Sequence, residues 1–137
     1  MTDSKIAIYT DGASRGNPGP ASYAYVIVRD NHVLHKTGNF LGKATNNQAE
    51  YHAVINALQE AIDRGIEQAD LYSDSKLLVN QLNNEWQVKD QDLQQLHGQV
   101  QDLLDRIDVR FSHVPRENQY VDQADTLCNR VLDQEGH

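Results

Sequence analysis

The sequence lacks several features that would place it in a membrane-bound or secreted class. Its single cysteine, Cys128, excludes an intramolecular disulfide framework and is typical of a reducing compartment. No run approaches the roughly 18 consecutive apolar residues of a membrane-spanning helix. The first residues, MTDSKIAIYTDG, lack a basic segment followed by an apolar one, so no signal peptide is expected. These absences predict a cytoplasmic protein that does not associate with membranes.

Positive charge is also scarce. The 137 residues contain 12 lysines and arginines against 20 aspartates and glutamates, which gives a formal net charge of −8. Phosphate binding usually requires a basic excess, so this composition argues against a nucleic-acid partner unless a local group of residues overrides it. The chain contains no linker, repeat or low-complexity segment. We therefore expect residues 1–137 to form a single domain.

Hydrophobic periodicity predicts a mixed α/β fold. Strands are expected at five places, which are residues 5–11, 22–29, 31–41, 69–73 and 108–114, and the turn Asp30-Asn31 should join the second and third in a hairpin. Helices are expected at four places, which are residues 45–65, 74 to about 84, 90–106 and 121–132. Three early strands followed by alternating helices and strands predict a mixed sheet with helices packed on it.

Carboxylates occur at unusual places in this pattern. Asp11 follows the apolar run KIAIYT and Asp74 follows LYS, so each is expected at the carboxyl end of a strand, where α/β sheets bind ligands. Glu50 shares the apolar face of its predicted helix with Leu58, whereas glutamates normally lie on the solvated face. Asp125 occupies a comparable position in the last helix.

Each carboxylate also has an ordinary structural explanation. Asp11 suits a turn before Gly12, Asp74 suits the N-cap of the next helix, and Glu50 would interact favourably with a helix dipole. Together, however, they favour a ligand site, because converging carboxylates repel one another unless protons or cations neutralise them. Oxygen ligands without histidine or cysteine suit Mg²⁺ or Mn²⁺ better than zinc.

Four segments resemble the acidic motifs of type I ribonuclease H: YTDGASRGNPGPA, TNNQAEYHAVINAL, YSDSKLLVNQL and ADTLCNRVLD. They occur in the family's order over nearly the whole chain, and NEWQVKD after the third is similar to the short archaeal-like and bacterial branch. The resemblance implies the α/β ribonuclease H-like fold, a five-stranded mixed sheet with its first three strands antiparallel and helices flanking it. It also implies a monomeric enzyme, without an obligate protein partner, that hydrolyses the RNA strand of RNA–DNA hybrids and leaves 5′-phosphate and 3′-hydroxyl ends.

The resemblance further assigns roles to individual residues. Two Mg²⁺ or Mn²⁺ ions are expected at four catalytic carboxylates, which are Asp11, Glu50, Asp74 and Asp125. Asp122 is a rival for the fourth position, because the preceding loop is slightly longer than usual. Contacts to the hybrid are expected from Arg15, Asn17, Thr45, Asn46, Asn47 and Lys76. Arg116 is expected to assist the leaving group or product release, and His113 to be structural.

Simpler roles remain open for some of these residues. One of Asn46 and Asn47 is expected to cap its helix, and Lys76 and Arg15 suit a solvated surface equally well. The glycines after Asp11 are expected to let the backbone approach the substrate. Trp86 is expected to pack under the long helix at 90–106 in preference to stacking on the substrate.

Two alternative functions are compatible with the same fold. One is cleavage of double-stranded RNA or of a junction, and the other is a non-catalytic nucleic-acid-binding module. The presence of all four carboxylates disfavours the module, because pure binding has no need to gather them. The segment NNEWQVKDQDLQQL replaces the basic helical protrusion of larger relatives with a short, non-basic one, so weak affinity for the hybrid is expected.

Overall fold

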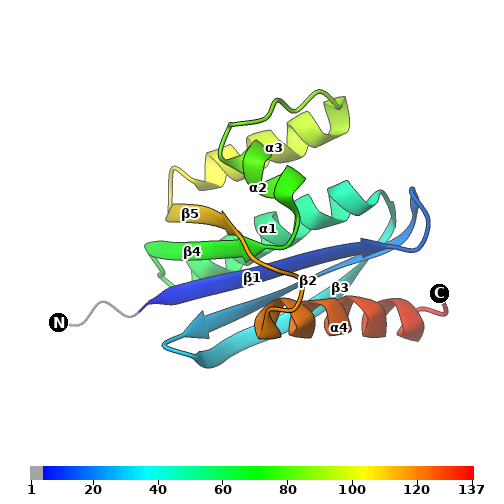
Figure 1. The fold of residues 1–137 in the computed structure, drawn as a ribbon, viewed down its shortest axis with the longest axis horizontal. Coiled ribbons are helices and arrows are strands. Elements are labelled where there is room, and N and C mark those ends of the chain that lie inside the picture. The colour runs from blue at the N-terminus through cyan, green and yellow to red at the C-terminus, as the bar shows by residue number, and fades with distance from the viewer. Residues whose placement is uncertain (1–4) are drawn as a thin grey trace.

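Residues 5–137 are described by a computed structural model. They form one five-stranded sheet in the order β3-β2-β1-β4-β5. The strands are β1 (Ile6–Ser14), β2 (Gly19–Arg29), β3 (His32–Ala44), β4 (Gln68–Ser73) and β5 (Asp108–His113). The β1–β2 and β2–β3 pairs are antiparallel, whereas the β1–β4 and β4–β5 pairs are parallel. The predicted mixed sheet is therefore confirmed (Figure 1).

The β2–β3 hairpin turns at Asp30 and Asn31 as expected, with φ values of 48° and 68°.

The first strand is longer than predicted. β1 pairs with β2 as far as Ser14, while its parallel pairing with β4 covers only Ala7 to Tyr9. The prediction that Asp11 ends this strand is wrong, because the antiparallel partner extends the strand after β4 has diverged. Asp11 lies just beyond the last residue paired with β4.

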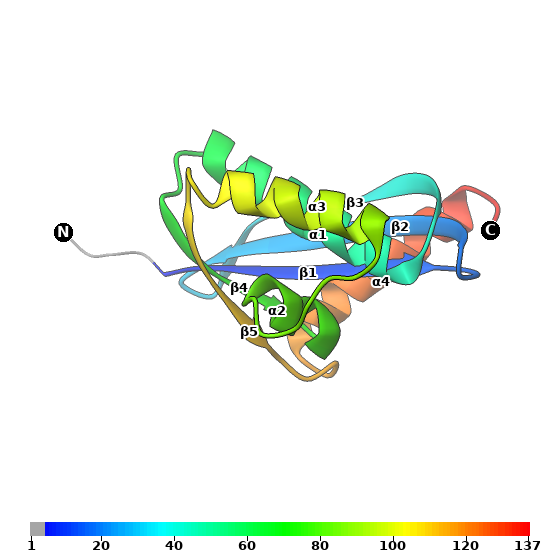
Figure 2. The same ribbon diagram turned by 90° about the horizontal axis from the view of Figure 1, so that it is seen from above.

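Helices cover both faces of the sheet. Within residues 5–137 they are α1 (Asn46–Asp63), α2 (Lys76–Leu82), α3 (Gln91–Leu103) and α4 (Gln119–Gln134). α1 and α3 lie on one side of the sheet and α4 lies on the other (Figure 2). The elements that carry predicted site residues therefore reach the sheet from opposite sides.

Side-chain caps determine where two of these helices begin. The Thr45 hydroxyl accepts a hydrogen bond from the Gln48 N–H, and the Gln48 side chain accepts one from the Thr45 N–H. Such a capping box stabilises a helix by about 1 kcal/mol. The prediction that Asn46 or Asn47 caps α1 is wrong, because Thr45 has the extended backbone of a cap. Likewise Ser75, and not Asp74, caps α2.

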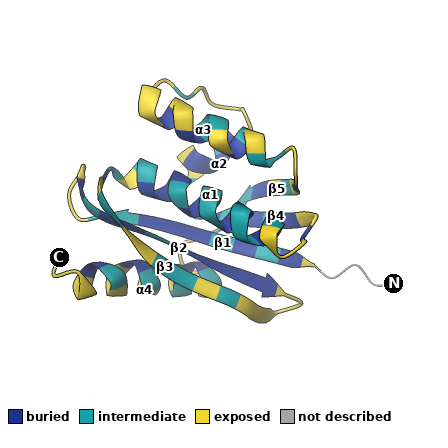
Figure 3. Cartoon of the chain, turned by 180° about the vertical axis from the view of Figure 1, so that it is seen from behind, coloured by how far each residue is buried: buried dark blue, intermediate teal, exposed yellow. Residues whose placement is uncertain are grey.

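The main core lies between the sheet and α1. Ile8, Ile27, Leu58 and Leu71 are completely buried there, and each contributes about 1.5–3 kcal/mol by leaving water. A smaller apolar cluster on the other side of the sheet includes Cys128 of α4. Figure 3 shows mostly buried residues along β1 and β2, and exposed or intermediate ones along the edge strand β3. None of the helices in residues 5–137 has the length and apolar character that a membrane span requires.

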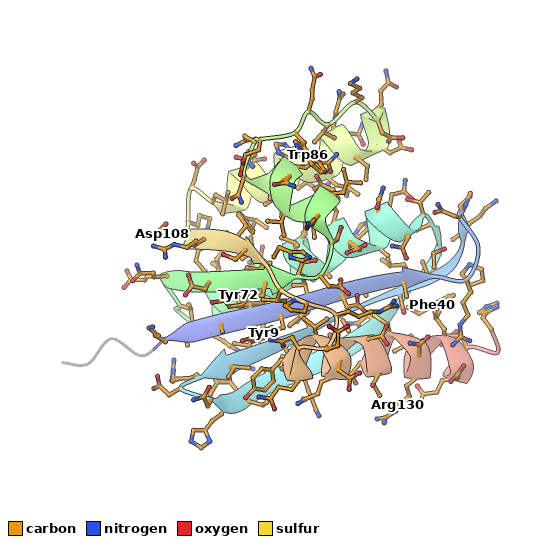
Figure 4. The ribbon with its side chains drawn as sticks, in the orientation of Figure 1. Tyr9, Phe40, Tyr72, Trp86, Asp108 and Arg130 are labelled. Atoms are coloured by element: carbon orange, nitrogen blue, oxygen red, sulfur yellow. The ribbon has the colours of Figure 1, made fainter. Side chains whose placement is uncertain are left out.

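Trp86 does not pack under α3 as predicted. It lies in the segment between α2 and α3 (Figure 4), and 51% of its surface is exposed. Asn84, with a φ of 60°, turns the chain as it leaves α2. The buried face of α3 is already provided by Leu93, Leu96 and Val100, which contact the main core. The prediction that Trp86 packs under α3 is therefore wrong.

Candidate metal centre and active site

Three carboxylates from three elements converge at one end of the sheet. Asp11 belongs to β1, Glu50 to α1, and Asp74 follows β4 directly. One oxygen atom from each lies within 4.8 Å of the others. Asp11 and Glu50 are each only 7% exposed. The convergence that we expected for these three side chains is therefore observed, and carboxyl groups are concentrated where water is largely excluded.

Gly12 explains how Glu50 reaches this place. A Cβ atom at Gly12 would lie 2.4 Å from the carbonyl carbon of Ala49 and 2.4 Å from the backbone nitrogen of Glu50. The first turns of α1 therefore rest directly on the backbone of β1, one residue after Asp11. The prediction that this glycine admits the substrate is wrong, because the space over it is filled by the helix.

Two buried oxygens of the cluster fit a cation. Asp11 Oδ2 and Glu50 Oε2 accept no hydrogen bond from residues 5–137, whereas Glu50 Oε1 accepts one from Asn46 Nδ2 at 3.0 Å. A buried carboxylate oxygen without a partner is costly. A hard divalent ion prefers ligand sets made of carboxylate oxygens. The donor set is thus suitable for such an ion.

Burial and mutual repulsion raise the pKa of two carboxyl groups. Burial raises the pKa of Asp11 to about 9, with further contributions from the nearby Asp74, Glu50 and Asp125. Burial, followed by the charge of Asp74, raises the pKa of Glu50 to about 8. Without a cation, both groups therefore keep a proton near neutral pH.

Asp125 approaches Asp11 from α4. Its charge contributes to the raised pKa of Asp11. Two contacts hold α4 against the sheet here: the Ser22 hydroxyl donates to the Cys128 carbonyl at 2.9 Å, and Cys128 Sγ donates to the Asp11 carbonyl at 3.6 Å. The rival Asp122 is exposed in the first turn of α4. The geometry thus favours Asp125 over Asp122 as the fourth acid.

Several residues predicted to contact a hybrid lie at the start of α1. The Asn46 N–H donates to Asn17 Oδ1 at 3.0 Å, so these two asparagines are neighbours. Thr45 is the α1 cap, and Asn47 is partly buried in the first turn. The Asn46 side chain also donates a hydrogen bond to Glu50. These two residues are four apart in α1, a spacing from which the sequence alone could have indicated the contact.

The other predicted side chains are more dispersed. Lys76 is exposed at the start of α2, two residues after Asp74. Arg116 is exposed in the loop between β5 and α4. His113 Nε2 lies 3.2 Å from the Asp74 carbonyl oxygen, which agrees with a structural role.

Arg15 contacts α4. Its Nη1 lies 2.8 Å from Asp133 Oδ1, and its Nη2 donates to the carbonyl and side-chain oxygens of Asn129. Arg15 and Asn129 are 114 residues apart, so no local sequence signal could have indicated this connection.

Comparison with known proteins gives this site its context. A family model described as reverse transcriptase-like matches residues 9–131. Ribonuclease H of Chlorobium phaeovibrioides is 34% identical, and the match covers 95% of this chain and 97% of that protein. The chain belongs to the ribonuclease H family. Ribonuclease HI of Halobacterium salinarum is 42% identical over 131 residues, covering 94% of this chain and 65% of that protein's length.

Solved structures of ribonuclease H proteins have the same fold. The crystal structure of the Halobacterium salinarum RNase H1 matches with a TM-score of 0.91 at 42% identity, covering 95% of this chain and 98% of that one. LC11-RNase H1, crystallised in complex with an RNA/DNA hybrid, also matches with a TM-score of 0.91, at 34% identity and with 97% of this chain and 100% of that chain covered. The predicted resemblance and the predicted ribonuclease H-like fold are both confirmed.

Proposed function

We propose that this ribonuclease H family member is an endoribonuclease that hydrolyses the RNA strand of RNA–DNA hybrids, leaving 5′-phosphate and 3′-hydroxyl ends. The observation that carries the proposal is the cluster of Asp11, Glu50 and Asp74, whose oxygens lie within 4.8 Å of one another. Family membership supports the substrate, because LC11-RNase H1 forms a complex with such a hybrid.

The proposed cofactor is a pair of Mg²⁺ or Mn²⁺ ions held by Asp11, Glu50, Asp74 and Asp125. When bound, these ions would supply an activated water and stabilise the leaving oxygen. The protein's own contribution is rigidity, because each carboxylate projects from a different packed element. Burial of Asp11 and Glu50 excludes bulk water, and this strengthens their electrostatic interactions.

Neighbouring residues complete the proposed site. Asn46 orients Glu50 through its 3.0 Å hydrogen bond. Asn17 and Asn46 lie side by side, and their amides suit the acceptors, donors and 2′-hydroxyls of a hybrid minor groove. We propose further contacts from Thr45 and Asn47, and a phosphate contact from Lys76. Arg116 is proposed to assist the leaving group or product release from its exposed loop.

A cleavage assay with each strand labelled in turn tests the function. We expect the RNA strand of a hybrid to be cut in the presence of Mg²⁺, while double-stranded DNA remains intact. A DNA duplex with one embedded ribonucleotide should be cut slowly or not at all, because recognition needs a run of 2′-hydroxyls. Preferential cleavage of double-stranded RNA, or efficient cleavage at the single ribonucleotide, would contradict the proposed substrate.

Variants of the cluster test the assignment of its residues. Asp11→Asn and Asp74→Asn should abolish cleavage with little change of fold, because each removes a charge while keeping the side-chain volume. Asp108→Asn is the control, since Asp108 is exposed and begins β5 at the opposite end of the sheet (Figure 4). Circular dichroism should be the same for all three variants. Cleavage at the wild-type rate by either cluster variant would refute the assignment.

We further propose that residues 1–137 act as one domain, in the cytoplasm, as a monomer without an obligate protein partner. The net charge of −8 supports the monomer, because it opposes self-association. Sedimentation velocity at micromolar concentration would measure the oligomeric state, and a dimer under these conditions would exclude the monomer.

A further inference from the structure

The β1–β2 turn, residues 14–20, is fastened to the helix that carries Glu50. The Asn46 N–H donates to Asn17 Oδ1 at 3.0 Å, and the Asn46 side chain donates to Glu50 Oε1 at 3.0 Å. Only two hydrogen bonds therefore separate the turn from this carboxylate. The side chain of Ser14 adds a second attachment, because its hydroxyl donates to the Ala44 carbonyl just before α1 at 2.8 Å.

Arg15 fastens the same turn to α4. Its guanidinium pairs with Asp133 at 2.8 Å and donates to the carbonyl and side-chain oxygens of Asn129 at 3.4 and 3.3 Å. The Asn129 side chain donates in turn to the Asp125 carbonyl at 3.0 Å. The turn itself is closed by the Arg15 N–H, which donates to the Pro20 carbonyl at 2.8 Å.

We infer that Arg15 is a positioning residue that couples the placement of Asp125 to that of Glu50 through the β1–β2 turn. This inference rests on the proposed function, in which both carboxylates hold divalent ions. α1 and α4 lie on opposite sides of the sheet (Figure 2), so a connection around the end of β1 can set their relative position. The Arg15 side chain is 33% exposed and that of Asp133 is 69% exposed, so the pair stabilises the fold only slightly.

The sequence had suggested a different role for Arg15, a direct contact with a substrate phosphate. The two roles predict opposite consequences for Asp133→Asn. If Arg15 bound phosphate, removing the Asp133 charge would free the guanidinium and leave KM for the hybrid unchanged or lower. If Arg15 positions α4, Asp133→Asn and Arg15→Met should impair the same step in the same direction.

Calcium binding provides a readout that is independent of cleavage. Isothermal titration with Ca²⁺ alone should give an affinity about threefold to tenfold weaker for Arg15→Met and for Asp133→Asn, the range expected for one ion pair with two further hydrogen bonds. The double variant should be no weaker than either single variant, because both changes remove the same connection. The charge exchange Arg15→Asp with Asp133→Arg should restore part of the affinity.

Arg64→Met is a matched control. Arg64 Nε pairs with Glu60 Oε2 at the same distance of 2.8 Å, and the two arginines are similarly exposed, at 36% and 33%. This pair, however, joins residues only four apart at the C-terminal end of α1. We expect it to leave Ca²⁺ affinity unchanged. In cleavage assays, Arg15→Met and Asp133→Asn should each require proportionately more Mg²⁺ for half-maximal kcat.

The outcomes separate the inference from the proposed function. Wild-type Ca²⁺ affinity in both single variants, or a lower KM for the hybrid in Asp133→Asn, would overturn the positioning role. A wild-type protein that binds Ca²⁺ but leaves the hybrid intact would contradict the proposed function, while the Ca²⁺ titrations would still decide whether Arg15 couples to the cluster.

Discussion

At the scale of single residues, the distinctive feature is two carboxyl groups buried close together. Asp11 and Glu50 are each 7% exposed, and Asp74 adds a third carboxyl group within 4.8 Å. A fold selected only for stability would gain by replacing them with neutral side chains of similar volume. Their burial is explained when a cation is the missing partner.

The raised pKa values predict how pH affects the metal-free protein. The pKa rises from 3.8 to about 9 for Asp11 and from 4.5 to about 8 for Glu50, so between these limits the folded state binds more protons than the unfolded state. Protonation of these two groups stabilises the folded state relative to the unfolded state. This stabilisation is complete below about pH 4 and is lost as pH rises through 8 and 9. The free energy of unfolding should therefore fall by at most about 1.4 kcal/mol per pH unit for each group.

Urea denaturation in a chelating buffer, at about pH 5, 7 and 9, measures this dependence. Asp11→Asn should make the free energy of unfolding depend less steeply on pH, because its side chain carries no charge. Its melting temperature, measured separately by thermal denaturation, should be higher than that of the wild type at the higher pH values. Asp108→Asn, at an exposed position, should keep the wild-type slope. An unchanged slope in Asp11→Asn would mean that the carboxyl group is not the source.

At the scale of secondary-structure elements, the contact between α1 and β1 decides where Glu50 lies. The absence of a side chain at Gly12 lets the backbone of Ala49 come within 2.4 Å of the place that a Cβ atom would occupy. A capped helix that started in the same way but packed farther out would not bring its glutamate to Asp11. The geometry of the candidate site therefore depends on one missing methyl group.

Gly12→Ala should accordingly impair both stability and activity. The added methyl must displace α1 or distort β1, which we expect to cost about 1–3 kcal/mol and to reduce hybrid cleavage strongly. Gly98→Ala is the matched control: a Cβ atom there meets nothing within 4 Å in the described part of the chain, and Gly98 lies inside α3. It should stabilise the protein by about 0.5–1 kcal/mol. Equal effects of the two substitutions on urea midpoints would contradict this account.

At the scale of the whole molecule, charge opposes the proposed substrate. The net charge is −8, and the segment after α2 contains no basic protrusion. Attraction for a hybrid must therefore come from a few residues near the cluster and from the cations held there. Lys76 and Arg116 are the exposed cations that we place in this group, while Arg15 is engaged by Asp133.

This balance predicts weak dependence of hybrid binding on monovalent salt. Each phosphate neutralised by a cationic side chain contributes about −0.9 to the slope of log affinity against log salt in B-DNA, so two or three contacts give a shallow slope. Divalent ions should matter more, because they convert a repulsive cluster into a phosphate site. Titration of a non-cleavable hybrid, at several salt concentrations and with or without Ca²⁺, measures both effects. Tight binding without divalent ions, combined with a steep slope, would reveal a basic surface and refute the prediction.

The sequence by itself predicted the secondary-structure elements and singled out the carboxylates that we propose as metal ligands. Alternating and helical hydrophobic patterns predicted all five strands and four helices, with shifts of a few residues at their ends, because these patterns depend on neighbours close in the chain. Asp11 and Asp74 stood out for the same local reason, since each directly follows an apolar run. Glu50 stood out because it interrupts an apolar helix face.

Only the tertiary structure decided how these pieces meet. The continuation of β1 past Asp11 depends on its pairing with β2. The need for a glycine at position 12 follows from the close approach of the α1 backbone to β1. The exposure of Trp86 follows from the way that α2 and α3 already fill their core. The contact of Arg15 with Asn129 spans 114 residues of sequence. Such features depend on packing between elements distant in the chain, and local periodicity carries no information about that packing.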